Sequence, residues 1–145
     1  NQYRLDLAMR MGATRAVDVA SETLEQVQKD LDMLEGFDVA LEMSGNPAAM
    51  TDILDNTIHG ANIALLGIPS EAYAIDWSTV IFNMLNIKGI YGREMYDTWY
   101  KMNVLIESGL DISPVITHRF PAEDYASAFE TLQGADTGKV ILNWR

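Results

Sequence analysis

The sequence contains no cysteine and only two histidines, His59 and His118. The lack of cysteine excludes disulfide bonds and thiolate metal sites within the chain, and two histidines cannot supply a histidine-rich zinc site. No apolar run approaches the roughly 18 residues that a membrane-spanning helix needs. The G-x-G-x-x-G turn, which cradles the pyrophosphate of a dinucleotide, is also absent. A pyrophosphate site of that kind therefore cannot be placed in this chain.

Basic residues are scarce as well: 10 Lys and Arg stand against 21 Asp and Glu, which gives a net charge of −11. Nucleic-acid binders need a basic stripe to neutralise phosphates, so this charge argues against that class of protein. It also disfavours binding to anionic membrane surfaces. With 145 residues, of which 48% are hydrophobic and 21% charged, the chain has the composition of a soluble globular domain with a sizeable core.

The clearest pattern is a strand–helix–strand unit. Two apolar runs, residues 37–43 and 61–69, flank a helical pattern. Asn46 is a suitable N-cap, Pro47 suits the first helical position, and Gly60 is expected to end the helix. Such a unit predicts two parallel strands with a right-handed crossover. Ligands of parallel sheets bind at the carboxyl ends of the strands.

The remaining segments extend this alternation. We expect helices at 1–11, at 21–34 with Ser21 as N-cap, at 76–84 with Asp76 as N-cap, at 94–107 and from 121, and strands at 16–19, 86–92, 115–120 and 139–144. Strand and helix alternate through about residue 110, which is typical of a doubly wound parallel sheet. The tail after this point could join the same sheet or form a second domain, and the pattern leaves both open.

Few residues point to chemistry. Glycines follow three predicted strands, at Gly45, Gly67 and Gly92, where a ligand could approach the backbone, but turn geometry alone also explains them. No histidine lies in a nucleophilic triad pattern. The apolar stripe Met95, Trp99 and Met102 is expected to pack in a core. Arg4 would lie close to an adenosine if its helix follows the second strand of a Rossmann sheet; a solvent-exposed arginine is the alternative.

Several segments along the whole chain match one enzyme family. They are Asn1-Gln2-Tyr3-Arg4-Leu5, Gly36-Phe37-Asp38-Val39, Leu41-Glu42-Met43-Ser44-Gly45, Leu66-Gly67-Ile68-Pro69, Ile87 to Met95, Thr98 to Met102 and Gly138 to Leu142. On these segments the chain resembles the carboxyl-terminal part of the zinc-dependent medium-chain alcohol dehydrogenases, and among them the L-threonine dehydrogenases. The segments Tyr91-Gly92-Arg93-Glu94-Met95 and Thr98-Trp99-Tyr100 are the most specific to that branch.

The resemblance implies an NAD- and zinc-dependent oxidation of L-threonine to 2-amino-3-oxobutanoate, with the zinc acting as a Lewis acid. It implies that Arg4 contacts the adenosine ribose side of NAD, and that Leu66, Gly67 and Ile68 pack along the nicotinamide half. Ile90 and Tyr91 would line the cofactor near the neighbouring-subunit edge. No residue of this chain is expected to be catalytic or to bind metal.

The resemblance also implies how the chain is organised. The zinc ligands, the proton relay and the glycine-rich turn would lie upstream of Asn1. Residues 1–110 would be part of an NAD-binding Rossmann domain, and residues 111–145 would return to the catalytic domain. We expect a cytoplasmic homotetramer that self-associates through the edge strand 87–91, and an isolated chain that is inactive, and rearranged, swapped, unstable or reduced to a compact βα remnant. Two alternatives stay open: another zinc-dependent polyol or alcohol dehydrogenase, and a non-enzymatic βα interaction module.

Overall fold

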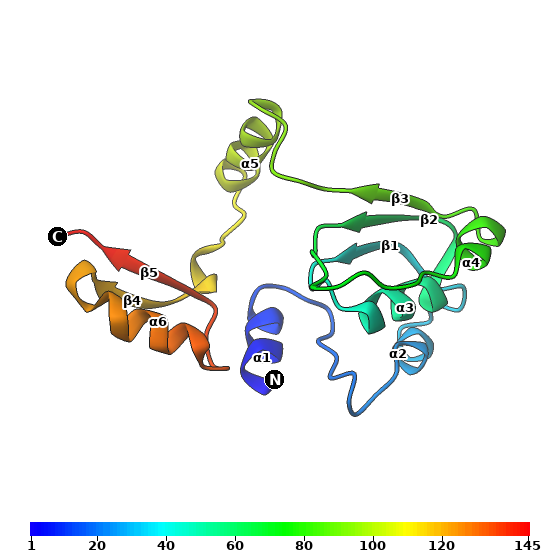
Figure 1. Ribbon diagram of the computed structural model, residues 1–145, viewed down its shortest axis with the longest axis horizontal. Helices are drawn as coiled ribbons and strands as arrows, with labels where there is room; N and C mark the ends of the chain where they lie inside the picture. The colour runs from blue at the N-terminus through cyan, green and yellow to red at the C-terminus, as the bar shows by residue number, and fades with distance from the viewer. The chain divides into compact units, whose positions relative to one another are not determined.

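The computed structural model describes all of residues 1–145. They form two compact units, one made of Glu22–Arg93 and the other of Asn1–Ser21 with Glu94–Arg145. Each unit contains parallel strands joined by a helix (Figure 1). The predicted α/β fold class is therefore confirmed. The division near residue 110 concerns the parts of a larger enzyme, and it stays a prediction.

The Glu22–Arg93 unit holds a three-stranded parallel sheet in the order β1-β2-β3. Its strands are β1 (Phe37–Glu42), β2 (Thr57–Leu65) and β3 (Asn86–Gly89). Its helices are α2 (Leu24–Asp30) before β1, α3 (Pro47–Asn56) between β1 and β2, and α4 (Trp77–Phe82) between β2 and β3. Three parallel strands that lie side by side in chain order are expected for one half of a Rossmann sheet. β1 and β3 are the two edges of this sheet.

Helix α3 begins as the sequence predicts. The Asn46 side chain accepts a hydrogen bond from the backbone N–H of Ala48 at 2.9 Å, and Pro47 occupies the first turn. Met50 and Leu54, four residues apart on one face, are buried against Ile63 of β2. This cluster is the core of the unit.

Gly60 does not end α3, and that prediction is wrong. The helix ends at Asn56 and β2 begins at the next residue. The pairing with β1 shifts between Phe37↔Thr57 and Val39↔Asn62, so the intervening residues of β2 form a bulge. Gly60 lies in this bulge at φ +78°, and its N–H donates to the carbonyl of Asn83 at 2.7 Å. The glycine is therefore explained by the left-handed backbone of a bulge rather than by a helix end.

Three further local predictions are wrong. Residues 16–19 form no strand in this structure, because no strand runs beside them to pair with their backbone groups. The N-cap of α2 is Thr23 rather than Ser21: the Thr23 Oγ1 accepts from the N–H of Gln26 at 3.2 Å. The Ser21 hydroxyl instead donates to the carbonyl of Asp18 at 3.0 Å, which closes a turn. The strand predicted at 86–92 is also shorter, since β3 ends at Gly89.

The other unit contains a separate two-stranded parallel sheet, β4-β5. Its elements are α1 (Gln2–Arg10), α5 (Asp97–Glu107), the 3₁₀ turn η1 (Ser113–Val115), β4 (Ile116–Pro121), the 3₁₀ turn η2 (Ala122–Asp124), α6 (Tyr125–Gln133) and β5 (Lys139–Asn143). The tail is thus a strand–helix–strand unit that does not extend β1–β3. The Thr117 hydroxyl accepts the N–H of Gly138 at 2.9 Å and ties β4 to the start of β5.

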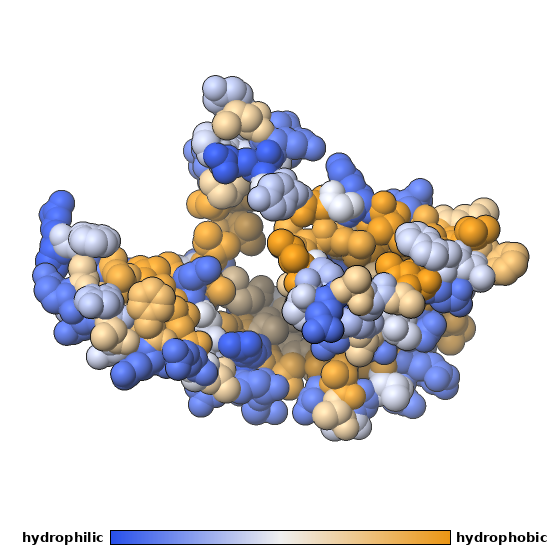
Figure 2. All heavy atoms as spheres, in the orientation of Figure 1, coloured by the Kyte–Doolittle hydropathy of each residue, from blue (hydrophilic) through white to orange (hydrophobic).

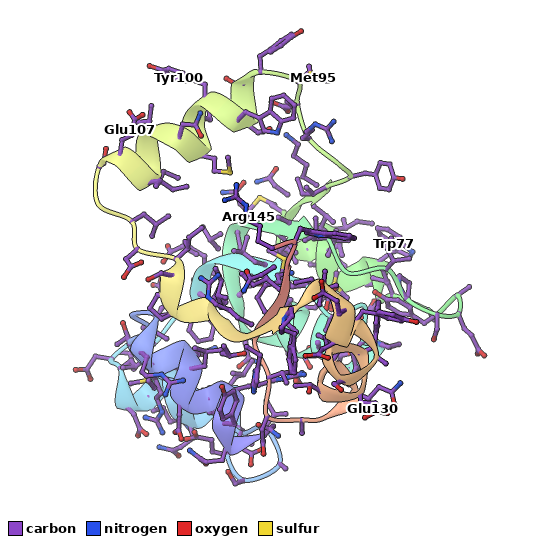
Figure 3. All side chains as sticks on the ribbon, turned by 90° about the vertical axis from the view of Figure 1, so that its left-hand side faces the viewer. Trp77, Met95, Tyr100, Glu107, Glu130 and Arg145 are labelled. Atoms are coloured by element: carbon purple, nitrogen blue, oxygen red, sulfur yellow. The ribbon has the colours of Figure 1, made fainter.

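Helix α5 has no buried residue. Met95, Trp99 and Met102 were expected to pack in a core, but they are 55%, 44% and 49% exposed. Figure 3 shows the side chain of Tyr100 projecting outward from this helix.

Hydrophobic atoms are exposed on both compact units (Figure 2). No helix has both the length and the apolar character that a bilayer crossing requires.

Candidate functional site

The candidate site lies where the strands of the three-stranded sheet end. β1 and β2 run parallel, so the loops after Glu42 and after Leu65 leave the same edge of the sheet. The backbone N–H groups of Leu66 and Gly67 donate to the carbonyl of Glu42 at 2.8 and 3.1 Å. These two hydrogen bonds hold the loop after β2 against the end of β1.

Gly45 and Gly67 allow the two loops to pack backbone against backbone. A Cβ atom on Gly67 would overlap the backbone nitrogen of Gly45 and the Glu42 carboxylate. Gly45 has φ +70°, and a Cβ there would overlap the carbonyl of Ile68. Both glycines are therefore explained by loop-to-loop contact and, for Gly45, by its left-handed backbone.

The Glu42 side chain lies inside this contact and is only 4% exposed. Its Oε1 accepts from the N–H of Ser44 at 2.8 Å, from the Ser44 hydroxyl at 2.5 Å and from the N–H of Gly45 at 3.0 Å. Its Oε2 accepts from the same Gly45 N–H at 3.0 Å. The hydrogen bond from the Ser44 hydroxyl, with those from backbone N–H groups, holds the pKa of Glu42 below its ordinary value, although burial opposes the shift.

Sequence reasoning missed Glu42. A signal was present: an acidic residue stands at the end of the apolar run 37–43 and is followed at once by Ser44-Gly45. A carboxylate that is buried at the end of a strand needs donors, and the following turn supplies them.

The predicted cofactor residues of this unit lie together at the same edge. Leu66, Gly67 and Ile68 follow β2, and Ile90 and Tyr91 follow β3, whose Gly89 pairs with Leu65. The N–H of Ile90 donates to the carbonyl of Leu65 at 2.8 Å, which carries the ladder one step past β3.

The side chains at this edge are apolar and open to solvent. Ile68 is 78% exposed, Leu66 44%, Ile90 38% and Tyr91 93%. Exposed apolar side chains at the carboxyl ends of parallel strands can pack against the ring of a planar ligand such as nicotinamide. The residues present at this edge therefore fit the cofactor half that the resemblance implies.

Arg4 belongs to the other compact unit. It is an exposed residue of the first turn of α1, where its N–H donates to the Asn1 side chain at 3.1 Å. Its predicted contact with the adenosine ribose stays a prediction.

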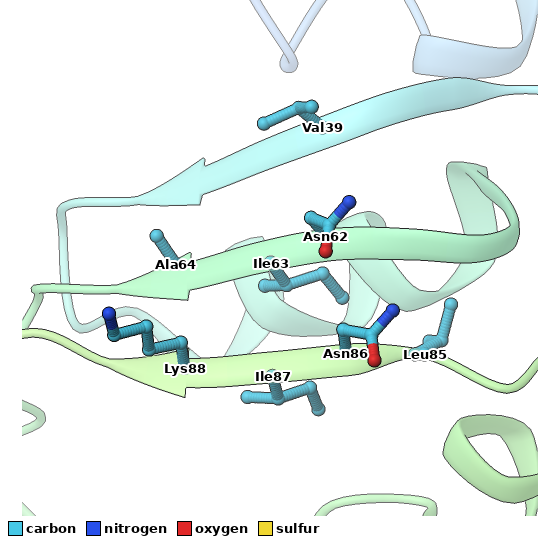
Figure 4. A pocket seen from close by; sticks show the side chains of 8 residues that line it. All are labelled: Val39, Asn62, Ile63, Ala64, Leu85, Asn86, Ile87 and Lys88. Atoms are coloured by element: carbon cyan, nitrogen blue, oxygen red, sulfur yellow. The ribbon is translucent and has the colours of Figure 1, made fainter.

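A groove of ≈ 530 Å³ lies along the middle of the sheet (Figure 4). Residues of all three strands line it, among them Val39, Asn62, Ala64 and Lys88. These four residues alternate with Ala40, Ile63 and Ile87, which pack into the core formed with α3. Lys88 is the only titratable side chain among the lining residues, and no second acid or base accompanies it, so the groove contains no catalytic pair.

No three His, Asp or Glu side chains come together in a way that could hold a metal ion. The Nδ1 atom of His118 lies 2.9 Å from the Thr117 hydroxyl, and His59 lies in the bulge of β2. The residues of this chain do not fit a zinc site, and we derive no catalytic step through zinc from them.

Comparison with known proteins gives a consistent result. Residues 1–108 match the family described as zinc-binding dehydrogenase. The chain is 63% identical over 144 residues to the L-threonine 3-dehydrogenase of Solibacter usitatus (strain Ellin6076), a match that covers 99% of this chain and 42% of that protein. The chain is 60% identical over 144 residues to the L-threonine 3-dehydrogenase of Shewanella frigidimarina (strain NCIMB 400), with the same two coverages, 99% and 42%.

A solved structure with the same fold is the 2R,3R-butanediol dehydrogenase of Bacillus subtilis, with a TM-score of 0.85 and 21% identity, covering 100% of this chain and 42% of that chain. The chain thus spans less than half the length of the relatives it matches. The matched residues 1–108 are most of its 145 residues and include the whole candidate edge. The chain belongs to the zinc-binding dehydrogenase family.

Proposed function

We propose that this chain is the carboxyl-terminal part of an L-threonine 3-dehydrogenase, which oxidises L-threonine to 2-amino-3-oxobutanoate with NAD⁺. The observation that carries the proposal is the 63% identity over 144 residues to a protein of that name. The match spans 144 of the 145 residues, so the aligned region includes the exposed edge residues as well as the core.

In this proposal, the edge formed by Leu66, Gly67, Ile68, Ile90 and Tyr91 receives the nicotinamide half of NAD, and Arg4 contacts the adenosine ribose. The exposed apolar side chains at the carboxyl ends of β2 and β3 support the first assignment. A protein described as a short chain alcohol dehydrogenase of Escherichia coli CFT073, solved with NADH, has the same fold, with a TM-score of 0.85 and 19% identity over 99% of this chain and 42% of that chain. NAD chemistry in a protein of this fold is consistent with the proposal.

The zinc ligands and the residues that move the proton belong to parts of the enzyme outside this chain. The chain covers 42% of the length of the L-threonine 3-dehydrogenase of Solibacter usitatus, and this partial coverage supports the division. Residues 1–110 are then the second half of the cofactor domain, and residues 111–145 pack with the catalytic domain. The isolated chain has no dehydrogenase activity.

We further propose that the enzyme is a cytoplasmic homotetramer whose subunits pair through the edge strand β3 and its extension to Tyr91. The edge position of β3 and the exposure of Ile90 and Tyr91 support this pairing. An Ile90→Lys variant should dissociate the oligomer in light scattering. Leu34→Lys, which changes an exposed leucine outside the strands, is the control and should leave the oligomer unchanged. An intact oligomer in the Ile90→Lys variant would contradict the assignment.

The direct test uses the full-length protein that contains this chain. NADH formation is measured with L-threonine, sorbitol and 2,3-butanediol as substrates. A kcat/KM that is highest for L-threonine supports the proposal. Preference for a polyol or diol identifies another dehydrogenase of the family, and a protein that neither binds NAD⁺ nor oxidises any of the three substrates is better described as an interaction module.

A further inference from the structure

We infer that Glu42 is a positioning residue for the cofactor edge: its buried carboxylate organises the Ser44-Gly45 turn against which the segment Leu66-Gly67-Ile68 is packed. The inference rests on the proposed function for the identity of the ligand. It adds a residue that has no contact with the ligand in that proposal and acts through the loop.

The Glu42 carboxylate is committed to the turn that follows β1. Both oxygens are engaged: the N–H and the hydroxyl of Ser44 and the N–H of Gly45 donate to them. Three donor groups on one carboxylate leave the turn little freedom, because moving it would leave a charge buried without partners. Glu42 therefore specifies the position of Gly45.

The Ser44-Gly45 turn is packed against the cofactor segment Leu66-Gly67-Ile68. Gly67 lies so close to Gly45 that a Cβ atom on Gly67 would overlap the backbone nitrogen of Gly45, and a Cβ atom on Gly45 would overlap the carbonyl of Ile68. The backbone of Glu42 contributes directly as well, because its carbonyl accepts from Leu66 and Gly67. Glu42 thus positions the cofactor segment in two ways. Its main-chain carbonyl binds the segment directly, and its side chain organises the turn against which the segment packs.

The cofactor segment must be held in place before it can bind a planar ligand. The side chains of Leu66 and Ile68 are exposed, so the segment has no packing on its outer side to keep it in place. A planar ring is bound well only if the surface that receives it is preorganised. The Glu42 turn supplies that order from the inner side of the segment.

The test compares Glu42→Gln with Asp38→Asn in the full-length enzyme. Both variants remove one carboxylate from β1, but Asp38 is exposed. In Glu42→Gln an amide N–H₂ replaces one acceptor oxygen and faces the N–H of Gly45. Because a charged hydrogen bond is worth roughly a factor of ten or more in an equilibrium constant, we expect the Kd for NAD⁺ to rise about tenfold. KM for L-threonine should stay within about twofold, and Asp38→Asn should resemble the wild type in both.

A purely structural role would give a different pattern. It would lower the melting temperature of Glu42→Gln and leave the NAD⁺ affinity of the folded variant unchanged, and this result would overturn the inference. Folding is verified by circular dichroism before affinity is measured. If Glu42→Gln does not fold, Ser44→Ala takes its place, since it removes the hydroxyl donor alone; an NAD⁺ affinity equal to that of the wild type would again overturn the inference.

Hydrogen exchange separates this inference from the proposed function. The amides of Leu66 and Gly67 should exchange faster in Glu42→Gln than in Asp38→Asn, with no cofactor present. If the wild-type enzyme does not bind NAD⁺, the proposed function is wrong, and the exchange rates alone decide whether Glu42 positions the segment. Equal exchange in the two variants would remove the positioning role.

Discussion

The β1–α3–β2 unit and the β4–α6–β5 unit share one connection, two parallel strands joined by a helix, but they differ in how much they bury. The first encloses Met50, Leu54 and Ile63. In the second, Ala128 is the only buried residue of α6, and Phe129 of the same helix is 60% exposed. The first has a third strand and α4 beside it. The second has two strands, and beside them α1 contributes the buried Leu7, which a Cβ atom on Gly138 would meet.

This difference shows that a strand–helix–strand unit is not by itself a stable core. Two strands offer the helix a narrow face, and three or more strands are usually needed for independent stability. We therefore expect β4–α6–β5 to gain its packing from other parts of the full-length enzyme, in agreement with its proposed place beside the catalytic domain. The predictions below test this contrast.

The largest effect should come from the core of the first unit. Met50 is 1% exposed, and Met50→Ala should lower the free energy of unfolding of this unit by about 2–5 kcal/mol, since it leaves a cavity. Phe129→Ala in α6 should cost less than about 1 kcal/mol in the isolated chain. Hydrogen exchange of the β2 amides measures the stability of β1–α3–β2, and exchange of the β5 amides measures that of β4–α6–β5. Equal losses would remove the distinction between the two units.

A smaller effect is expected from the loop contact in the first unit. Gly67→Ala should cost about 1–3 kcal/mol, because the added methyl overlaps Gly45 and the Glu42 carboxylate. Gly89→Ala is the matched control: a Cβ there meets nothing within 4 Å and the backbone is not left-handed. Urea unfolding should leave the control within about 0.5 kcal/mol of the wild type. If Gly67→Ala left the free energy of unfolding unchanged, the two loops would not be tightly packed.

The Glu42 carboxylate should make the first unit sensitive to acid. Its pKa is below the ordinary 4.5 in the folded state, because Ser44 and Gly45 donate hydrogen bonds to the charged form. The stabilisation is complete above the pKa of the unfolded chain and is lost as the pH falls through the lowered folded pKa. At neutral pH the free energy of unfolding of Glu42→Gln should therefore be about 1–3 kcal/mol lower than that of the wild type. This difference should become smaller as the pH falls. Thermal unfolding across pH checks this, and a constant gap would count against it.

The smallest effect concerns helix capping. Asn46 caps α3 through its side chain, whereas Asp124 at the start of α6 makes no capping hydrogen bond. Asn46→Ala should destabilise by about 1 kcal/mol, and Asp124→Ala by no more than about 0.5 kcal/mol. Denaturant titration measures both. An Asp124 effect as large as that of Asn46 would indicate that α6 is held as firmly as α3.

The sequence by itself determined the elements whose signals are local. The cap Asn46-Pro47, the cap Asp76 and the apolar period of Met50 and Leu54 act within a few residues, so the α3 and α4 helices and the parallel strands beside them could be predicted. The grouping of Leu66–Ile68 with Ile90 and Tyr91 also followed, because parallel neighbours end at one edge. Their contact with NAD came from the resemblance and stays a prediction.

Only the tertiary structure decided the features that depend on a partner distant in the sequence. Gly60 has the sequence signature of a helix end, and the pairing with β1 makes it a bulge instead. Residues 16–19 have strand propensity but lack a neighbouring strand, and the stripe on α5 lacks a surface to cover it. Glu42 is the clearest case. In the sequence it is one acidic residue in an apolar run, and it becomes a buried acceptor because two loops, some 20 residues apart in the chain, meet around it.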